Sequence, residues 1–357
     1  MSAPVTDPLR LKIDLQALGM RTPPEIDTRA GGAGPADGIT IFIGDLVATV
    51  PTGAWYAGDS PYELRNRSDG SWRLARDNVE VARVTLADEP GFYRRSTADN
   101  TPYRSFALRH GRDAIGSTVA QGCSHGDLSC KFCAISTSKL SGVTLASKTP
   151  GQLAEVAEAA EAEGFTHIVM TTGSTGEDAG ITHLAACAAA VRERTRMKIH
   201  VQFEPPEDPA LIDLAASVAD TAAINIESFD EAVLGNMAPS KARAGMERYR
   251  GAWNRAVQLL GEGQVTSFLI VGLGESSRSI IDGSKLLVSL GVYPYLLPLR
   301  PLPGTPLESW QPPPPDATMD IFERAAAIVM DAGLRASSCL AGCVRCGACT
   351  TFTDLTG

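Results

Sequence analysis

The sequence predicts an α/β protein built on a partial (β/α)6 TIM-like barrel, with a β-rich unit before it and a cysteine-rich extension after it. Short apolar strands alternate with helices from about residue 115 onward, and polar or cysteine-rich segments recur where each strand ends. Strands that alternate with helices form a parallel sheet with right-handed crossovers. Six strand–helix units are fewer than the eight of a closed barrel, so we expect an open sheet.

Composition and charge narrow the class of protein. The chain has 357 residues, of which 44% are hydrophobic and 20% charged, as in an ordinary globular protein. No apolar run is long enough to span a membrane, and the first residues lack the pattern of a signal peptide. A net charge of −9 gives no electrostatic footprint for nucleic acid or anionic lipid. We expect a cytoplasmic protein with no nucleic-acid or membrane partner.

Residues 1–114 form the predicted N-terminal β-rich unit. Residues 1 to about 30 are rich in proline and weakly patterned, so we expect partial disorder there. Segments 39–43 and 79–86 show the alternation or dense β-branching of strands. No chemistry follows from these residues.

Residues 115–310 form the predicted barrel. Thr149 suits the N-cap and Pro150 the first turn of its first long helix. The expected helices span 150–164, 181–195, 208–218, 241–261 and 276–290. The expected strands span 117–120, 167–170, 198–203, 222–226, 265–271 and 295–299. Residues 311–357 follow as an extension with a helix near 317–332, without which we expect the barrel to fold.

Three cysteines, Cys123, Cys130 and Cys133, lie within eleven residues just after the first barrel strand. Thiolates are the usual ligands of iron–sulfur clusters, and three of them leave one iron of a [4Fe–4S] cubane open to another ligand. The alternative is zinc, with His125 as a fourth ligand, although structural zinc sites usually take their cysteines as separated pairs.

Four more cysteines gather at the C-terminus: Cys339, Cys343, Cys346 and Cys349. Their compact spacing favours an auxiliary [4Fe–4S] cluster over structural zinc, which remains the alternative. Two tight thiol groups in a chain without an export signal indicate metal ligands rather than disulfides. The eighth cysteine, Cys187, lies in an alanine-rich run and is expected to be a buried helix residue.

Polar or glycine-rich residues follow each predicted barrel strand. Because ligands gather at the carboxyl ends of parallel strands, we expect these residues to form one site. Arg300 follows the sixth strand, and its bidentate guanidinium makes it the candidate catalytic residue for a substrate carboxylate or phosphate. After the first five strands the residues are Cys123; Thr171, Thr172 and Gly173; Glu204; Glu227; and Gly272, Gly274 and Glu275.

Motifs at 132–133, 171–173, 270–275 and 303–307 resemble those of the radical S-adenosylmethionine (SAM) superfamily, most closely its biotin-synthase-like branch. Phe132 stands before Cys133, where the superfamily's Cys-x3-Cys-x2-Cys loop has an aromatic residue. Here six residues, not three, separate Cys123 from Cys130, so the loop is extended. The resemblance covers roughly 115–310, and the chain is also similar to radical SAM proteins of bacterial nitrilase-linked gene clusters.

The resemblance implies reductive cleavage of SAM at the [4Fe–4S] cluster to a 5′-deoxyadenosyl radical that acts on a small-molecule substrate. It also implies a reductant such as flavodoxin or ferredoxin. In this family the protein fixes geometry while the cofactor supplies reactivity.

The same resemblance assigns SAM-binding roles by position. Thr171, Thr172 and Gly173 correspond to the segment that orients the SAM amino group. Asn225 and Glu227 match the ribose contact of the fourth strand. The remaining expected cofactor-binding residues are Phe132, Glu204, Arg248, Gly272, Gly274 and Glu275.

Some of these roles have rivals. Glu204 could bind ribose or cap the next helix, and Lys241 and Arg243 rival Arg248 for the SAM carboxylate. Two other classes of function remain open: a non-catalytic iron–sulfur electron carrier, and a zinc-stabilised α/β binding protein.

Overall fold

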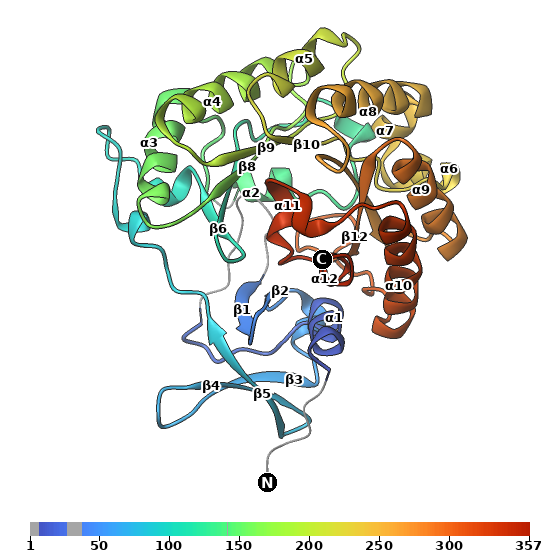
Figure 1. The fold of residues 1–357 in the computed structure, drawn as a ribbon. Helices are drawn as coiled ribbons and strands as arrows, with labels where there is room; N and C mark the ends of the chain where they lie inside the picture. The colour runs from blue at the N-terminus through green and yellow to red at the C-terminus, as the bar shows by residue number, and fades with distance from the viewer. Residues whose placement is uncertain (1–6, 27–37, 141) are drawn as a thin grey trace.

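A computed structural model describes residues 7–26, 38–140 and 142–357 and shows a curled seven-stranded sheet as its central layer (Figure 1). The six strands β7 to β12 are parallel, and β6 pairs antiparallel with β7 at one edge. This confirms the prediction of a partial barrel of six strand–helix units. In sheet order the strands are β12 (Val292–Pro298), β11 (Val265–Val271), β10 (Thr221–Ala223), β9 (Lys198–Gln202), β8 (His167–Thr171), β7 (Ala114–Thr118) and β6 (Leu108–His110).

Helices cover the convex face of this sheet. The expected cap forms as Thr149 accepts a hydrogen bond from the Gln152 N–H, with Pro150 as the first residue of α3. Cys187 is fully buried in α4, as expected. The expected helix over 241–261 instead ends and restarts at Gly245, whose φ is 79°. The crossover helices are α3 (Pro150–Glu161), α4 (Ile181–Arg194), α5 (Ala210–Ala216), α8 (Met246–Leu260) and α9 (Ser277–Ser289).

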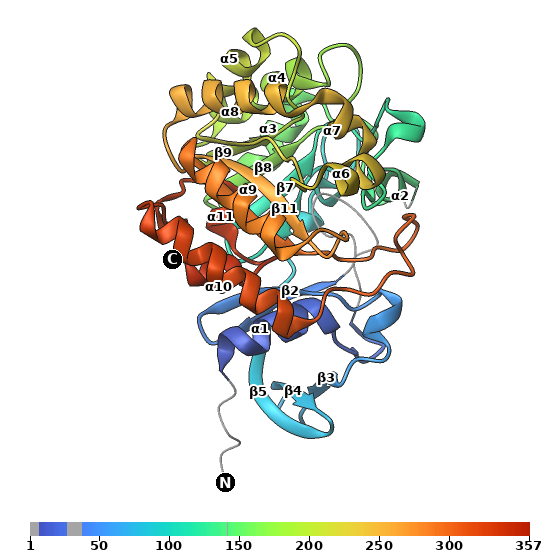
Figure 2. The same cartoon turned by 90° about the vertical axis from the view of Figure 1, so that its right-hand side faces the viewer.

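Three short helices stand beside the carboxyl ends of the strands (Figure 2). They are α2 (Ile135–Leu140), α6 (Glu231–Met237) and α7 (Pro239–Ala244). None of the three was expected as a separate helix, and α6 and α7 pack against each other.

The N-terminal unit is a second, antiparallel sheet packed with a helix. Helix α1 (Pro8–Leu18) is capped by Asp7, so the expectation of disorder is wrong for this segment; residues 27–37 lie outside the described residues. Strand β6 belongs to the barrel sheet, so this sheet ends well before residue 114. In sheet order its strands are β2 (Leu46–Val50), β1 (Ile39–Ile43), β5 (Val79–Leu86), β4 (Trp72–Arg76) and β3 (Tyr62–Asn66).

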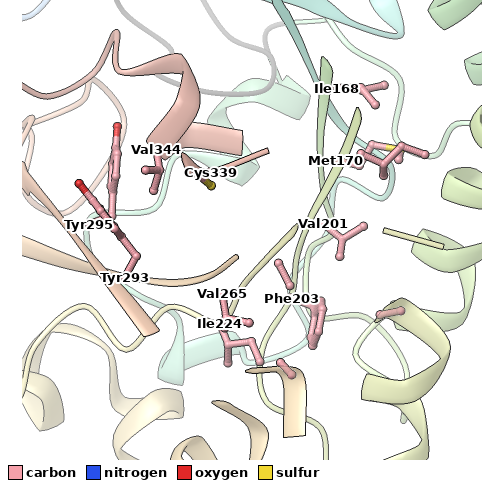
Figure 3. Packing of buried hydrophobic residues seen from close by; sticks show 14 of the residues in the cluster. Ile168, Met170, Val201, Phe203, Ile224, Val265, Tyr293, Tyr295, Cys339 and Val344 are labelled. Atoms are coloured by element: carbon pink, nitrogen blue, oxygen red, sulfur yellow. The ribbon is translucent and has the colours of Figure 1, made fainter. Parts of the chain in front are cut away.

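The C-terminal segment lies against the concave side of the barrel sheet (Figure 1). After α10 (Pro315–Asp331), the helix α11 (Gly342–Cys346) contacts β8 and β9, and α12 (Phe352–Leu355) contacts β12. Cys339 and Val344 belong to the same buried cluster as Tyr293 and Tyr295 of β12 (Figure 3). The extension therefore contributes to the barrel's buried core, and folding of the barrel without it stays a prediction. Among the described residues, no helix is long and apolar enough to cross a membrane.

Candidate active site

Hydrogen bonds fix both sides of the loop that carries the first three cysteines. The N–H and hydroxyl of Ser124 donate to the Ser174 carbonyl, at 2.8 and 2.7 Å. On the other side the Lys131 N–H donates to the Met237 carbonyl at 2.9 Å. The loop therefore lies across the carboxyl ends of the strands, between the segment after β8 and the end of α6.

Gly173 brings the segment after β8 against this loop. Its N–H donates to the Ala120 carbonyl at 2.9 Å, and a Cβ at this position would lie 1.6 Å from the Gly122 carbonyl oxygen. No side chain fits in that space, so glycine lets Thr172 and Gly173 approach the residue that precedes Cys123. The hydroxyl of Thr171 donates to Thr118 at 2.9 Å and joins β8 to β7.

The donor set of the loop fits an iron–sulfur cluster. Cys123 and Cys133 are exposed and Cys130 is half-buried. Burial raises the pKa of Cys130 to about 12, and the ammonium of Lys241 opposes that rise. In the described part of the chain, no three His, Cys, Asp or Glu side chains lie close enough to hold a single metal ion. The fit rests on donor chemistry, because each thiolate of a cubane binds a different iron.

A cavity of about 300 Å³ adjoins the loop. His125 and Leu128 of the loop form one wall, and residues of α7 and α8 form another. Lys241, Arg243 and Arg248, the three expected rivals for the SAM carboxylate, all line it. The other lining residues are Glu204, Pro205, Glu207, Ser240, Ala244 and Tyr249.

Glu227 and Lys241 form a buried ion pair beneath this cavity, with Nζ 3.1 Å from Oε1 and side-chain exposures of 9% and 8%. Burial opposes the charge of Lys241, yet Glu227 holds the pKa of the ammonium well above its usual value. The same ammonium donates to the Asn225 carbonyl.

The backbone of Glu227 has φ 75°, a left-handed conformation that non-glycine residues adopt at a cost and that clusters at functional sites. Its second oxygen, Oε2, is buried and has no hydrogen-bond partner in the described part of the chain. A ribose hydroxyl or an amino group of SAM would satisfy this orphaned acceptor, so the residues present fit SAM.

His125 donates a hydrogen bond to the Glu204 carboxylate, with Nε2 2.7 Å from Oε2. This pairing uses Glu204 in the cavity wall rather than as a helix cap. It also engages the histidine that the zinc alternative required as a ligand. Arg248 forms a pair with Glu207 at 3.0 Å, but the Glu207 side chain is 83% exposed, so solvent screens the pair.

The remaining expected cofactor residues shape the strand ends. Glu275 accepts the Gly272 N–H at 2.9 Å through Oε1, while its Oε2 is buried without a partner among the described residues. Gly272 and Gly274 have φ of 105° and 111°, which permits the turn after β11. The Asn225 side chain accepts the Phe268 N–H at 3.1 Å. Phe132 packs half-buried against the barrel core.

Arg300 is placed differently from the other expected site residues. Its guanidinium Nη2 donates to the Thr49 carbonyl in β2 at 2.9 Å, and it does not line the 300 Å³ cavity. The structure thus joins Arg300 to the N-terminal unit, and its catalytic role stays a prediction.

The segment that carries the four C-terminal cysteines lies on the concave side of the sheet. The Gln202 amide of β9 donates to the Cys343 sulfur at 3.4 Å. Burial raises the pKa of Cys343 well above its usual value, and the neighbouring thiols of Cys349 and Cys346 act in the same direction. Burial likewise raises the pKa of Tyr295, with Cys349 and Cys343 next in effect. Three of the four thiols thus lie close to one another and to β12.

Two residues near the site were not expected. Gln121 is 4% exposed, and neither polar atom of its side chain has a hydrogen-bond partner among the described residues. His125 was expected only as a zinc ligand. The only sign of Gln121 in the sequence is its position two residues before Cys123. Its burial becomes visible only in the structure.

The fold and the site place this protein in the class of α/β half-barrels that carry a three-cysteine loop at the carboxyl ends of their strands. The model of the radical SAM superfamily matches residues 117–286, from β7 into α9. Lipoyl synthase of Marinobacter nauticus is 28% identical over 193 residues, which cover 52% of this chain and 53% of that protein. The chain thus spans about half the length of this curated relative.

Two solved structures are similar in fold to this chain. Methylornithine synthase superposes with a TM-score of 0.47 at 16% identity, covering 63% of this chain and 64% of that one. A radical SAM methyltransferase from Sphaerobacter thermophilus gives 0.46 at 19% identity, covering 77% and 75%.

Residues 117–286 of this chain are thus similar to the radical SAM superfamily. This confirms the resemblance drawn from the motifs, including its biotin-synthase-like character.

Proposed function

We propose that this protein is an enzyme that cleaves SAM reductively at a [4Fe–4S] cluster held by Cys123, Cys130 and Cys133. The resulting radical reacts with a small-molecule substrate. The observation that carries the proposal is the contact between the cysteine loop and the segment after β8, where Gly173 meets the Gly122 carbonyl. When bound, the cluster and SAM supply a 5′-deoxyadenosyl radical that abstracts hydrogen from the substrate.

The chain's own residues bind and orient SAM. The backbone around Thr172 and Gly173 orients the amino group beside the loop. Glu227 binds a ribose hydroxyl through its unpaired Oε2, and Glu204, held by His125, binds a second hydroxyl. Lys241 already serves Glu227, so Arg248, whose partner Glu207 is exposed, is the better partner for the SAM carboxylate.

The C-terminal thiols hold an auxiliary [4Fe–4S] cluster in this proposal. Its support is the gathering of Cys343, Cys346 and Cys349 around Tyr295 on the concave side of the sheet. The reductant is a one-electron donor such as flavodoxin or ferredoxin. Arg300 remains the candidate for binding an anionic group of the substrate.

The test is cleavage of SAM by the anaerobically reconstituted protein with dithionite, read as 5′-deoxyadenosine by chromatography. The parent is expected to form it, and a Cys130→Ala variant is expected to lose one cluster's iron and the product together. Product formation at the parent rate in Cys130→Ala would overturn the proposal.

A further inference from the structure

The turn between the last two cysteines is held by residues from the other end of the chain. Gly347 and Ala348 form this turn between Cys346 and Cys349. The Lys12 ammonium donates to the Gly347 carbonyl at 2.9 Å. The Gln16 amide and the Thr49 N–H both donate to the Ala348 carbonyl, at 3.2 and 2.7 Å. Three donors of the N-terminal unit thus form hydrogen bonds with the two carbonyls of this turn.

Helix α1 turns a polar face inward to make these contacts. Lys12 and Gln16, four residues apart and on one side of the helix, are 0% and 1% exposed. Burying such groups is costly unless each is paired, and both are. Lys12 forms an ion pair with Asp354 at 2.6 Å, and Gln16 accepts a hydrogen bond from the Thr351 hydroxyl at 3.0 Å. The buried polar groups of Lys12 and Gln16 therefore form their hydrogen bonds and ion pair with residues 347–354.

The barrel supplies the other walls around the same thiols. Gln202 reaches Cys343 from β9. Gly111, in the turn between β6 and β7, lies so near Cys346 that a Cβ there would be 2.6 Å from the sulfur. Arg300 binds the Thr49 carbonyl and so ties the donor strand β2 to the end of β12. The side facing the Gly347–Ala348 turn is closed by the N-terminal unit.

We propose that the N-terminal unit positions the four-cysteine site, with Lys12 and Gln16 as positioning residues that fix the turn carrying Cys346 and Cys349. The proposal rests on the auxiliary cluster of the proposed function. A short turn with free carbonyls would otherwise sample many conformations, and fixing it beforehand lowers the entropic cost of placing two thiolates on one cluster.

Two variants and one control test the proposal. Lys12→Met removes the ammonium, and Gln16→Leu removes the amide without changing charge. Arg10→Met is the control, because Arg10 lies on the same helix but pairs with Asp14 and Asp316 instead. Each protein is reconstituted anaerobically, and iron and zinc per chain, the rate of iron release to a chelator, and far-UV circular dichroism are measured.

We expect Lys12→Met to fall from about eight to about four irons per chain, or to release the second four roughly tenfold faster. Gln16→Leu is expected to change in the same direction by less, and Arg10→Met to match the parent. All three should keep the parent's helical spectrum and still form 5′-deoxyadenosine without substrate. Parent iron content and release rate in both Lys12→Met and Gln16→Leu would overturn the proposal.

A Cys343→Ala/Cys346→Ala variant separates this proposal from the proposed function. If that variant keeps the parent's iron, the auxiliary cluster and the positioning role both fall, while SAM cleavage at the first cluster is tested separately by Cys130→Ala. If it loses about four irons while Lys12→Met and Gln16→Leu keep theirs, only the positioning role falls.

Discussion

The ion pair between Lys241 and Glu227 gives the sharpest prediction about the site. Replacing Lys241 with methionine keeps the length of the side chain but leaves the Glu227 carboxylate buried without its cation. Breaking a buried pair by removing one partner costs about 3–5 kcal/mol. Loss of the contact to the Asn225 carbonyl acts in the same direction.

Lys285→Met is the matched control. Lys285 pairs with Asp282 at 3.3 Å, close to the 3.1 Å of the buried pair, but its side chain is 60% exposed rather than 8%. An exposed pair contributes little to stability because solvent screens it. The two substitutions are identical in chemistry, so the difference between them measures burial.

Urea unfolding of the holo proteins under anaerobic conditions, followed by tryptophan fluorescence, measures both free energies of unfolding. We expect a large drop for Lys241→Met and almost none for Lys285→Met. Adding Glu227→Gln to Lys241→Met should recover part of the loss, because no charge then remains buried. Equal destabilisation by the two single substitutions, or no recovery in the double variant, would refute the reasoning.

Three further predictions follow from other residues. Arg248→Ala should weaken SAM binding roughly 30- to 150-fold and leave the iron content unchanged. The control Arg250→Ala, at an exposed position on the same helix, should not change SAM binding. An unchanged dissociation constant in Arg248→Ala would favour Arg243 as the partner of the SAM carboxylate. Gly173→Ala should lose the first cluster's iron because the Cβ would collide with the Gly122 carbonyl, while Gly235→Ala, which has open space around it, should retain it; equal iron in both would count against the contact. Burial lowers the pKa of Lys148 to about 7 in the folded protein. Between about pH 7 and pH 10 the unfolded chain therefore binds a proton at Lys148 that the folded protein lacks, so the free energy of unfolding rises with pH. That rise should be smaller in Lys148→Met, measured as unfolding midpoints from pH 7 to 9.5, and identical slopes would contradict the assignment.

The order of the barrel elements could be predicted from sequence because the strands are short apolar runs that alternate with helical segments. The strand over 265–271 was predicted to the residue. Helix α1 could not be predicted from sequence, because Lys12, Asp14 and Gln16 are buried and interrupt the apolar stripe that usually marks a helix. The partners of Lys12 and Gln16 lie more than 300 residues away, so no local pattern reveals them.

The candidate site was predictable in part for a similar reason. Residues that follow strands, such as Glu204 and Glu227, could be placed at one edge of the sheet from topology alone. The pairing of Glu227 with Lys241 depends on how α7 packs beside the segment that follows β10, and the packing of α11 depends on strands β8 and β9. These features arise from tertiary contacts that spacing does not encode.

The central claim is that the loop's three thiols leave one iron open to SAM. Electron paramagnetic resonance of the dithionite-reduced protein, recorded with and without SAM, tests it most directly. We use the Cys343→Ala/Cys346→Ala background, so that the first cluster alone contributes the signal. SAM is expected to change the spectrum of that cluster, and Cys130→Ala in the same background should lack the signal altogether. A spectrum that SAM leaves unchanged at saturating concentration would contradict the claim.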